Sequence, residues 1–246
     1  MIDIHNHIMP GIDDGSPDMA TSLAMLEKAE RAGITDIILT PHYIKGSIYN
    51  ANNVKKWQVF NELRQAAIGA GRRVNLYLGN EVYIDGKLAE MLAAYVGKTT
   101  PEMYEISTLN STKYVLVEFP IRTEDKTAKN TLFSLVQMGF VPVIAHPERY
   151  IYVQENPEKV DELIGMGCLL QGNYLSLTGR YGKRAEKTLK RLLFGNKIFC
   201  LASDIHKYTD EYQVELVRKK LMRILRSEQA IQDLLVNNPR RVLRGE

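Results

Sequence analysis

Residues that can bind a metal ion follow nearly every predicted strand of this chain. All five histidines belong to this set, which is His5, His7, Asp13 or Asp14, His42, Glu81, Glu118, His146, Asp204 and His206. In a parallel β/α barrel the carboxyl ends of the strands meet at one face, so we expect these side chains to converge there. Imidazole and carboxylate groups are the usual ligands of zinc, manganese and iron. The pattern therefore predicts a metal site.

Local spacing supports some of these positions more strongly than others. His5 and His7 alternate along a predicted strand and so face the same side, as do Asp204 and His206. Glu118 lies in an apolar strand, where a carboxylate needs a partner or a cation.

Three positions have a simpler alternative when each is taken alone. His42 could be a loop histidine, Glu81 could cap a following helix, and His146 before Pro147 could belong to a turn. Spacing does not separate Asp13 from Asp14 as the ligand.

The number of candidate ligands indicates more than one ion. Four carboxylates and five imidazoles are too many for one tetrahedral zinc ion. Mixed oxygen and nitrogen donors suit manganese, with iron or zinc as alternatives. We therefore expect two or three divalent metal ions.

Seven short runs of β-branched and aliphatic residues alternate with helical segments, as β/α units require. No linker rich in Pro, Gly or Ser interrupts the alternation, and a helical tail with a solvated charged face is expected from about 210. We therefore predict a single α/β domain over residues 1–246, a distorted (β/α)7 TIM-like barrel. Its predicted strands are 2–6, 35–41, 74–80, 114–119, 141–145, 168–172 and 198–203.

Composition is that of an ordinary globular protein, with 45% hydrophobic and 25% charged residues among 246. No apolar run reaches the roughly 20 residues of a membrane helix, and no secretory signal is recognised, so we expect a cytoplasmic protein without membrane insertion. The net charge of +3 over 32 basic and 29 acidic residues gives no case for nucleic-acid binding.

The two cysteines argue against thiol chemistry. A cysteine-dependent tyrosine phosphatase loop has Arg six residues after Cys, but Tyr174 follows Cys168 at that spacing and His206 follows Cys200. Both cysteines lie in apolar runs and are predicted to be buried, reduced thiols.

The sequence resembles the polymerase and histidinol phosphatase (PHP) superfamily, and within it the capsule-locus protein tyrosine phosphatases of Gram-positive bacteria. The resemblance implies a distorted seven-stranded β/α barrel with a trinuclear metal site. It covers almost the whole chain and is carried by Asp3-Ile4-His5-Asn6-His7, Asp13-Asp14-Gly15, Gly79-Asn80-Glu81-Val82-Tyr83, Val117-Glu118-Phe119, Ile144-Ala145-His146-Pro147-Glu148-Arg149-Tyr150 and Ala202-Ser203-Asp204-Ile205-His206.

The family pattern also implies a role for individual positions. One ion would be held by His5, His7, Glu81 and Asp204, a second by Glu81, Glu118 and His146, and a third by Asp14, His42 and His206. The choice of Asp14 over Asp13 rests on the resemblance alone. Arg149 matches a phosphate-binding arginine of the family. A second family arginine has no counterpart after His206, and Lys207 is the candidate replacement as a point charge.

These features predict hydrolysis of phosphotyrosine on a protein by a metal-bridged hydroxide, with Arg149 and the ions neutralising the phosphoryl oxygens. The resemblance implies that the partner is the tyrosine-rich tail of a bacterial capsule or exopolysaccharide kinase. The alternatives are a histidinol-phosphate phosphatase, a metal-dependent nuclease and a non-catalytic metal-binding partner module. An amidohydrolase also opens with His-x-His, but its usual bridging lysine would replace the glutamates found here.

Overall fold

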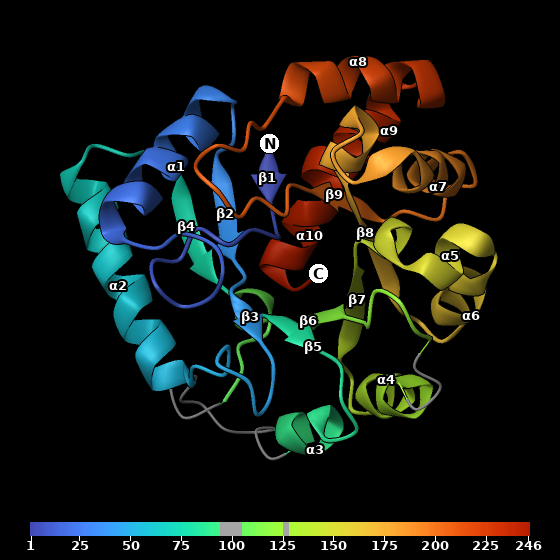
Figure 1. Ribbon diagram of the computed structural model, residues 1–246, viewed down its shortest axis with the longest axis horizontal. Helices are drawn as coiled ribbons and strands as arrows, with labels where there is room; N and C mark the ends of the chain where they lie inside the picture. The colour runs from blue at the N-terminus through green and yellow to red at the C-terminus, as the bar shows by residue number, and fades with distance from the viewer. Residues whose placement is uncertain (94–104, 125–127) are drawn as a thin grey trace.

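The strands of the protein are parallel and form two sheets that lie inside a ring of helices (Figure 1). The computed structural model describes residues 1–93, 105–124 and 128–246. One sheet has the order β1-β2-β4 and the other β3-β5-β6-β7-β8-β9. The strands are β1 (Ile2–Asp3), β2 (Asp36–Leu39), β3 (His42–Tyr43), β4 (Asn75–Leu78), β5 (Glu81–Tyr83), β6 (Tyr114–Glu118), β7 (Val141–Ala145), β8 (Leu169–Asn173) and β9 (Cys200–Ala202).

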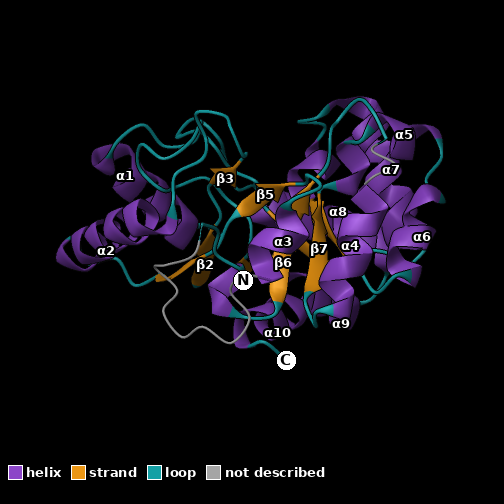
Figure 2. Ribbon diagram, turned by 90° about the horizontal axis from the view of Figure 1, so that it is seen from below, coloured by secondary structure: helices purple, strands orange, loops and turns teal. Residues whose placement is uncertain are grey.

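Helices surround the strands on the outside, and loops gather at the edge where the strands end (Figure 2). They are α1 (Met19–Arg31), α2 (Asn53–Gly69), α3 (Leu88–Ala93), α4 (Ala128–Gln137), α5 (Ile151–Glu155), α6 (Lys159–Gly165), α7 (Gly182–Phe194), α8 (Val214–Leu225), α9 (Glu228–Gln232) and α10 (Asn238–Arg244). Within the described ranges, none of these helices is long and apolar enough to cross a membrane.

Each of the seven predicted strands has a counterpart, and two further short strands lie beyond the predicted ranges. β3 follows the predicted run 35–41 after a break at Thr40 and Pro41, and β5 follows the predicted run 74–80 after Gly79 and Asn80. Proline has no backbone N–H to donate to a sheet, which explains the first break. A Cβ atom on Gly79 would lie 2.9 Å from Leu109 Cδ2, so glycine lets Leu109 pack closely at this point.

The segments that follow the first and last strands contact each other. A parallel bridge joins Asn6 to Ile205, and the backbone N–H of Asp204 donates to the carbonyl of His5 at 2.8 Å. The segments that follow β1 and β9 therefore run side by side. The predicted parallel α/β architecture is confirmed.

The apolar core has two parts, one between the strands and the helices and one enclosed by the strands. The inner part includes Ile4, Leu116 and Ala202. Both cysteines are buried as predicted, and burial raises the pKa of the Cys168 thiol to about 12. A thiol with so high a pKa is not a nucleophile at neutral pH.

Candidate metal centre

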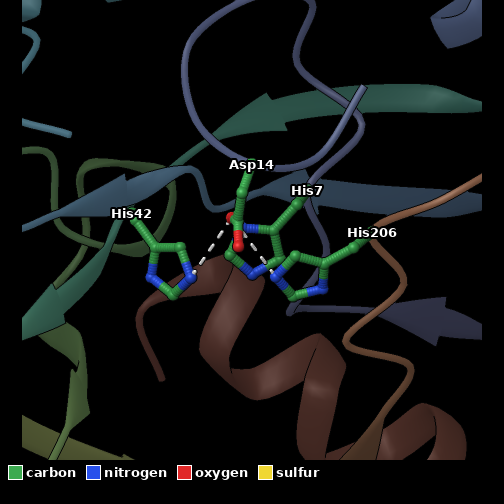
Figure 3. Close-up of side chains that lie close together, drawn as sticks. All are labelled: His7, Asp14, His42 and His206. Atoms are coloured by element: carbon green, nitrogen blue, oxygen red, sulfur yellow. Dashed lines mark ion pairs between the residues drawn. The ribbon is translucent and has the colours of Figure 1, made fainter. Parts of the chain in front are cut away.

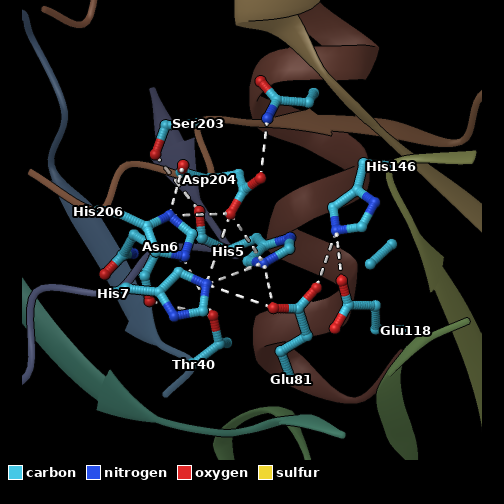
Figure 4. Close-up of polar contacts among 12 residues, drawn as sticks. His5, Asn6, His7, Thr40, Glu81, Glu118, His146, Ser203, Asp204 and His206 are labelled. Carbon is cyan, nitrogen blue, oxygen red and sulfur yellow. Dashed lines mark hydrogen bonds and ion pairs between the residues drawn. The ribbon is translucent and has the colours of Figure 1, made fainter. Parts of the chain in front are cut away.

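The strand ends place the predicted ligands in one cluster, with Asp14 and His42 drawn in Figure 3 and the others in Figure 4. His5 and His7 follow β1, Asp204 and His206 follow β9, and the loop after His7 brings in Asp14. His42 and Glu81 begin β3 and β5, Glu118 ends β6, and His146 directly follows β7. Two of them have left-handed backbone, since φ is 34° at His146 and 53° at Asp204. Such strain in non-glycine residues is concentrated at functional sites.

The deepest group consists of His5, His7, Glu81 and Asp204, all of them buried, with one potential ligand atom from each within 4.8 Å of the others. Nε2 of His5 lies 3.2 Å from Glu81 Oε2 and 3.4 Å from Asp204 Oδ1. Nε2 of His7 lies 3.3 Å from the same Glu81 oxygen. Two imidazole nitrogens and two carboxylate oxygens therefore face a common centre.

The chemistry of this group fits a cation. Glu81 Oε2 and Asp204 Oδ1 are buried and accept no hydrogen bond from any described residue. Burial lowers the pKa of His5, but Glu81 and Asp204 outweigh this effect and raise it to about 9. Without a metal ion, the imidazole of His5 therefore holds a proton beside these carboxylates, and a metal ion would replace that proton and satisfy the same negative charge.

Hydrogen bonds on the far side of the two imidazole rings direct Nε2 toward this centre. Nδ1 of His5 lies 2.7 Å from Gln171 Oε1, whose amide group is oriented by its bond to the carbonyl of Gly172. An amide oxygen only accepts, so Nδ1 of His5 carries a hydrogen, and Nε2 is the nitrogen that would give its lone pair to a metal ion. Asp13 makes the equivalent contact, 2.7 Å from Nδ1 of His7. Such outer partners fix the tautomer of metal-binding histidines.

Asp14 has a different position from Asp13 and belongs to a second group with His7, His42 and His206 (Figure 3). Its Oδ1 lies 3.6 Å from Nε2 of both His42 and His206. The rings of His7 and His206 stack with centroids 3.8 Å apart. Asp14 is half exposed, so this group opens toward solvent. Asp13 thus contacts Nδ1 of His7 from outside the cluster, whereas Asp14 points into it.

The third group, His42, Glu81 and Glu118, differs in part from the arrangement implied by the family resemblance. His42 Nδ1 lies 3.1 Å from Glu81 Oε2 and 3.8 Å from Glu118 Oε2. His146, the partner implied by the resemblance, places Nε2 3.0 Å from Glu81 Oε1 and 3.7 Å from Glu118 Oε1. Glu81 thus lies between both histidines. Burial and the charge of Glu81 raise the pKa of Glu118 to about 8, which again indicates a crowded anionic site.

The two residues predicted to contact phosphate lie in different surroundings. Arg149 ends the 3-10 turn after β7, and its Nη1 donates to Asp204 Oδ2 at 2.7 Å. Its guanidinium carbon lies 4.5 Å from the centre of the Tyr181 ring. Lys207 is exposed directly after His206, and its side chain makes no ion pair with the described residues. Only Arg149 is therefore in contact with the ligand cluster.

Several residues of the site were not predicted from the sequence. Strand β8 supplies no predicted ligand, but its Gln171 and Asn173 are buried and bind His5 and Asp204. Asp3 accepts hydrogen bonds from the backbone N–H and hydroxyl of Ser203, beside Asp204. Tyr181 donates its hydroxyl to Asp204 Oδ2 at 3.4 Å. The available signal was polar residues at alternate positions of an apolar strand.

The sequence matches a known protein family and several of its members. The sequence profile of a family described as "Capsular polysaccharide synthesis, CpsB/CapC" matches residues 1–244. The tyrosine-protein phosphatase YwqE of Bacillus subtilis (strain 168) is 35% identical over 206 residues, covering 84% of this chain and 77% of YwqE. The tyrosine-protein phosphatase CpsB of Streptococcus pneumoniae is 30% identical over 253 residues, covering 99% and 98%.

The fold of this chain also matches solved structures over most of its length. A crystal structure from work on YwqE from Bacillus subtilis and CpsB from Streptococcus pneumoniae, described as unique metal-dependent tyrosine phosphatases, superimposes with a TM-score of 0.90 at 32% identity. The match covers 100% of this chain and 95% of that one. Histidinol phosphate phosphatase from Lactococcus lactis subsp. lactis matches with a TM-score of 0.57 at 15% identity over 90% and 92% of the two chains, which shows a shared fold alone.

Proposed function

The chain belongs to the CpsB/CapC family of capsular polysaccharide synthesis proteins, and from that premise we propose that it is a metal-dependent protein tyrosine phosphatase. The observation that carries the proposal is the convergence of five histidines and four carboxylates at the carboxyl ends of the strands. Relatives over nearly the whole chain are named tyrosine-protein phosphatases, which supports the same activity. The reaction is hydrolysis of a phosphoric monoester.

We assign the candidate ligands to two or three divalent ions, with manganese as the metal we expect. Bound ions of this kind supply an activated water and positive charge for the phosphoryl oxygens. His5, His7, Glu81 and Asp204 would hold one ion, Glu81, Glu118 and His146 a second, and Asp14, His42 and His206 a third. His42 also lies close enough to Glu81 and Glu118 to complete the second set.

The protein's own contribution is to position the phosphoryl group. Arg149 offers a planar guanidinium at the edge of the cluster, and only one of its five N–H donors is needed for Asp204. Its remaining donors can bind two phosphoryl oxygens, which makes Arg149 the residue that orients the group and stabilises its developing charge. Lys207 would add a second positive charge from the adjacent loop. Tyrosine, with a pKa of about 10, leaves without a strong general acid.

The substrate we propose is a phosphotyrosine protein, namely the tyrosine-rich tail of a bacterial capsule or exopolysaccharide kinase. The competing substrate is histidinol phosphate, and the competing function is a metal-binding module without catalysis. Both alternatives are decided by the same assay.

The test is hydrolysis of a phosphotyrosine peptide and of histidinol phosphate, with manganese and with chelator. The chain is compared with His146→Ala and with Lys55→Ala, an exposed position on α2 that serves as the control. We expect peptide-selective, metal-dependent turnover that is lost in His146→Ala and kept in Lys55→Ala. Preference for histidinol phosphate would replace the proposed substrate, and absence of turnover on both would favour the binding module or a metal-dependent nuclease.

A further inference from the structure

Helix α7 begins at the edge of the metal centre. The hydroxyl of Tyr181, the residue before the helix, donates to Asp204 Oδ2, and its ring lies against Arg149. Arg180 forms an ion pair of 2.8 Å with Asp210, whose carboxylate also accepts the backbone N–H groups of His206 and Lys207. The start of α7 is therefore fixed to the same loop that carries a candidate ligand.

The first half of α7 presents unpaired positive charge to solvent. Lys183, Arg184 and Lys187 are exposed and lie on one face of the helix at positions i, i+1 and i+4. The opposite face packs into the core through Ala185 and Leu189. Within the described part of the chain, none of the three cations forms an ion pair.

The second half of the same helix differs. Lys190 pairs with Glu186 at 2.7 Å, and Arg191 pairs with Glu158 across to the segment before α6. Positive charge is thus left uncompensated only in the part of α7 that is nearest to the metal centre. We call Lys183, Arg184 and Lys187 the cationic strip.

Charge is also segregated along the whole chain. Residues 180–246 contain 16 basic and 8 acidic residues, whereas residues 1–179 contain 16 basic and 21 acidic ones. Although the net charge of the whole protein is small, basic residues outnumber acidic ones by two to one in residues 180–246. Arg218 and Arg240 of this segment lie near the amino group of Met1, at the start of β1, so the excess does not all face the site. Because opposite charges attract over about 10 Å at moderate ionic strength, the cations at the start of α7 are the ones that draw anions toward its edge.

We propose that the cationic strip binds anionic side chains that flank the phosphotyrosine in the substrate. The inference rests on the proposed function and adds a second contact outside the metal centre. A helix rises about 1.5 Å per residue, so Lys183 and Lys187 are separated by about 6 Å along the axis. An extended peptide advances about 3.3 Å per residue, so a glutamate or second phosphotyrosine three to five positions from the phosphotyrosine lies about 10 to 17 Å from it along the peptide, and this is the group that we assign to the strip. The partner it fits is an acidic or multiply phosphorylated peptide segment.

The test compares three peptides that share one phosphotyrosine: one with neutral flanks, one with glutamates three to five positions away on either side, and one with a second phosphotyrosine there. The manganese-loaded protein is compared with the triple variant Lys183→Ala, Arg184→Ala, Lys187→Ala. A matched control removes the same charge from a neighbouring helix and its end, with Lys219→Ala, Arg223→Ala and Arg226→Ala. All six positions are exposed.

We expect kcat/KM to be about tenfold higher for the anionic peptides than for the neutral one at low salt, through KM, and the preference to shrink as salt rises. The preference should disappear in the triple variant and persist in the control. Turnover of p-nitrophenyl phosphate, which cannot reach the strip, should be equal in all three proteins. Comparison of the two anionic peptides then shows whether glutamate or phosphotyrosine is preferred.

Other outcomes would overturn the inference. One is an equal kcat/KM for all three peptides. Another is a loss of peptide preference in the control variant as large as that in the triple variant, which would indicate a general effect of charge. Loss of binding to vesicles with anionic lipid in the triple variant, with peptide preference intact, would assign the strip to a membrane surface. Binding of fluorescent phosphonate analogues of the same peptides is measured in parallel. These binding measurements test the strip even if no phosphate ester is hydrolysed. Absence of hydrolysis would count against the proposed function but not against the strip.

Discussion

The carboxylate of Asp13 lies 2.7 Å from Nδ1 of His7, while Oδ1 of the neighbouring Asp14 lies 3.6 Å from Nε2 of both His42 and His206. Asp13 is buried and also accepts the backbone N–H of His42 at 2.9 Å. It therefore connects two candidate ligands without pointing into the cluster. Burial raises the pKa of Asp13, but the ion pair with His7 outweighs this and lowers it to about 2, so it stays ionised.

Substitution of the two adjacent aspartates should change metal binding in different ways. Asp14→Asn should lower the number of bound ions by one, because it removes a carboxylate from the solvent-facing group. Asp13→Asn should keep the full number of ions but weaken their affinity by about 10- to 100-fold, since the supporting carboxylate of His7 is lost. Equilibrium dialysis with elemental analysis measures both quantities. Equal ion numbers and affinities in the two variants would contradict the distinction.

Gln171 should affect metal affinity although it contacts Nδ1 of His5, the ring nitrogen that faces away from the cluster. Gln171→Leu removes the acceptor for Nδ1 of His5, so the ring can rotate or change tautomer, and we expect about 10- to 100-fold weaker binding. Gln171→Glu restores an acceptor and should restore affinity. Titration calorimetry with manganese distinguishes them. If Gln171→Glu were as weak as Gln171→Leu, packing of β8 and not the hydrogen bond would be the cause.

Much of this site follows from the sequence because strand ends are easy to locate. Runs of β-branched residues fixed the strands, and a parallel barrel then requires His5, Glu118 and Asp204 to meet whatever the loops do. The contact between His5 and Gln171, in contrast, joins residues 166 positions apart and depends on side-chain rotamers. Arg180 was missed for the same reason, because its proximity to the site comes from the turn before α7.

Removal of metal should destabilise the fold. Glu81 and Asp204 keep buried oxygens without hydrogen-bond donors among the described residues, and a cation satisfies them only in the folded state. An ion present at 100 times its Kd adds about 2.7 kcal/mol, equivalent to roughly 5 to 10 °C in Tm for a chain of this size.

Thermal unfolding with manganese and with chelator measures this shift. Glu81→Gln should show a smaller difference between the two conditions, because Glu81 contacts several candidate ligands. A chelator-independent Tm in the unmodified chain would argue against a metal centre at these residues.

Arg149 and Lys207 should contribute unequally to phosphate binding. Arg149→Lys keeps the charge but loses the planar fork, and we expect kcat/KM for a phosphotyrosine peptide to fall by about 100-fold. Lys207→Ala removes an exposed charge and should raise KM only a few-fold at low salt with kcat unchanged. Steady-state kinetics at two salt concentrations tests both. An effect of Lys207→Ala on kcat as large as that of Arg149→Lys would place Lys207 in direct contact with the reacting group.

Lys56 gives a prediction that concerns stability and not catalysis. Its ammonium group is buried and lies 2.6 Å from Asn80 Oδ1 and 3.0 Å from the carbonyl of Glu105. Asn80 precedes Glu81 and donates to the carbonyl of Pro41, which precedes His42, so Lys56 supports the backbone beside two candidate ligands. Burial lowers the pKa of Lys56 from 10.5 to about 7, against the opposing charge of Glu105.

The sign of the pH effect follows from that lowered pKa. Above about pH 7 the folded protein has lost the proton of Lys56, whereas the unfolded chain keeps it up to about pH 10, so unfolding takes up a proton. The contribution of Lys56 to the free energy of unfolding should therefore rise from pH 7 to pH 10, by at most about 1.4 kcal/mol per pH unit. Urea unfolding of the native chain and of Lys56→Met at pH 7, 8 and 9 isolates this contribution, because every other titrating group is common to both. The free energy of unfolding of the native chain minus that of Lys56→Met should rise with pH, and parallel profiles would mean that Lys56 has the same charge in the folded and unfolded states.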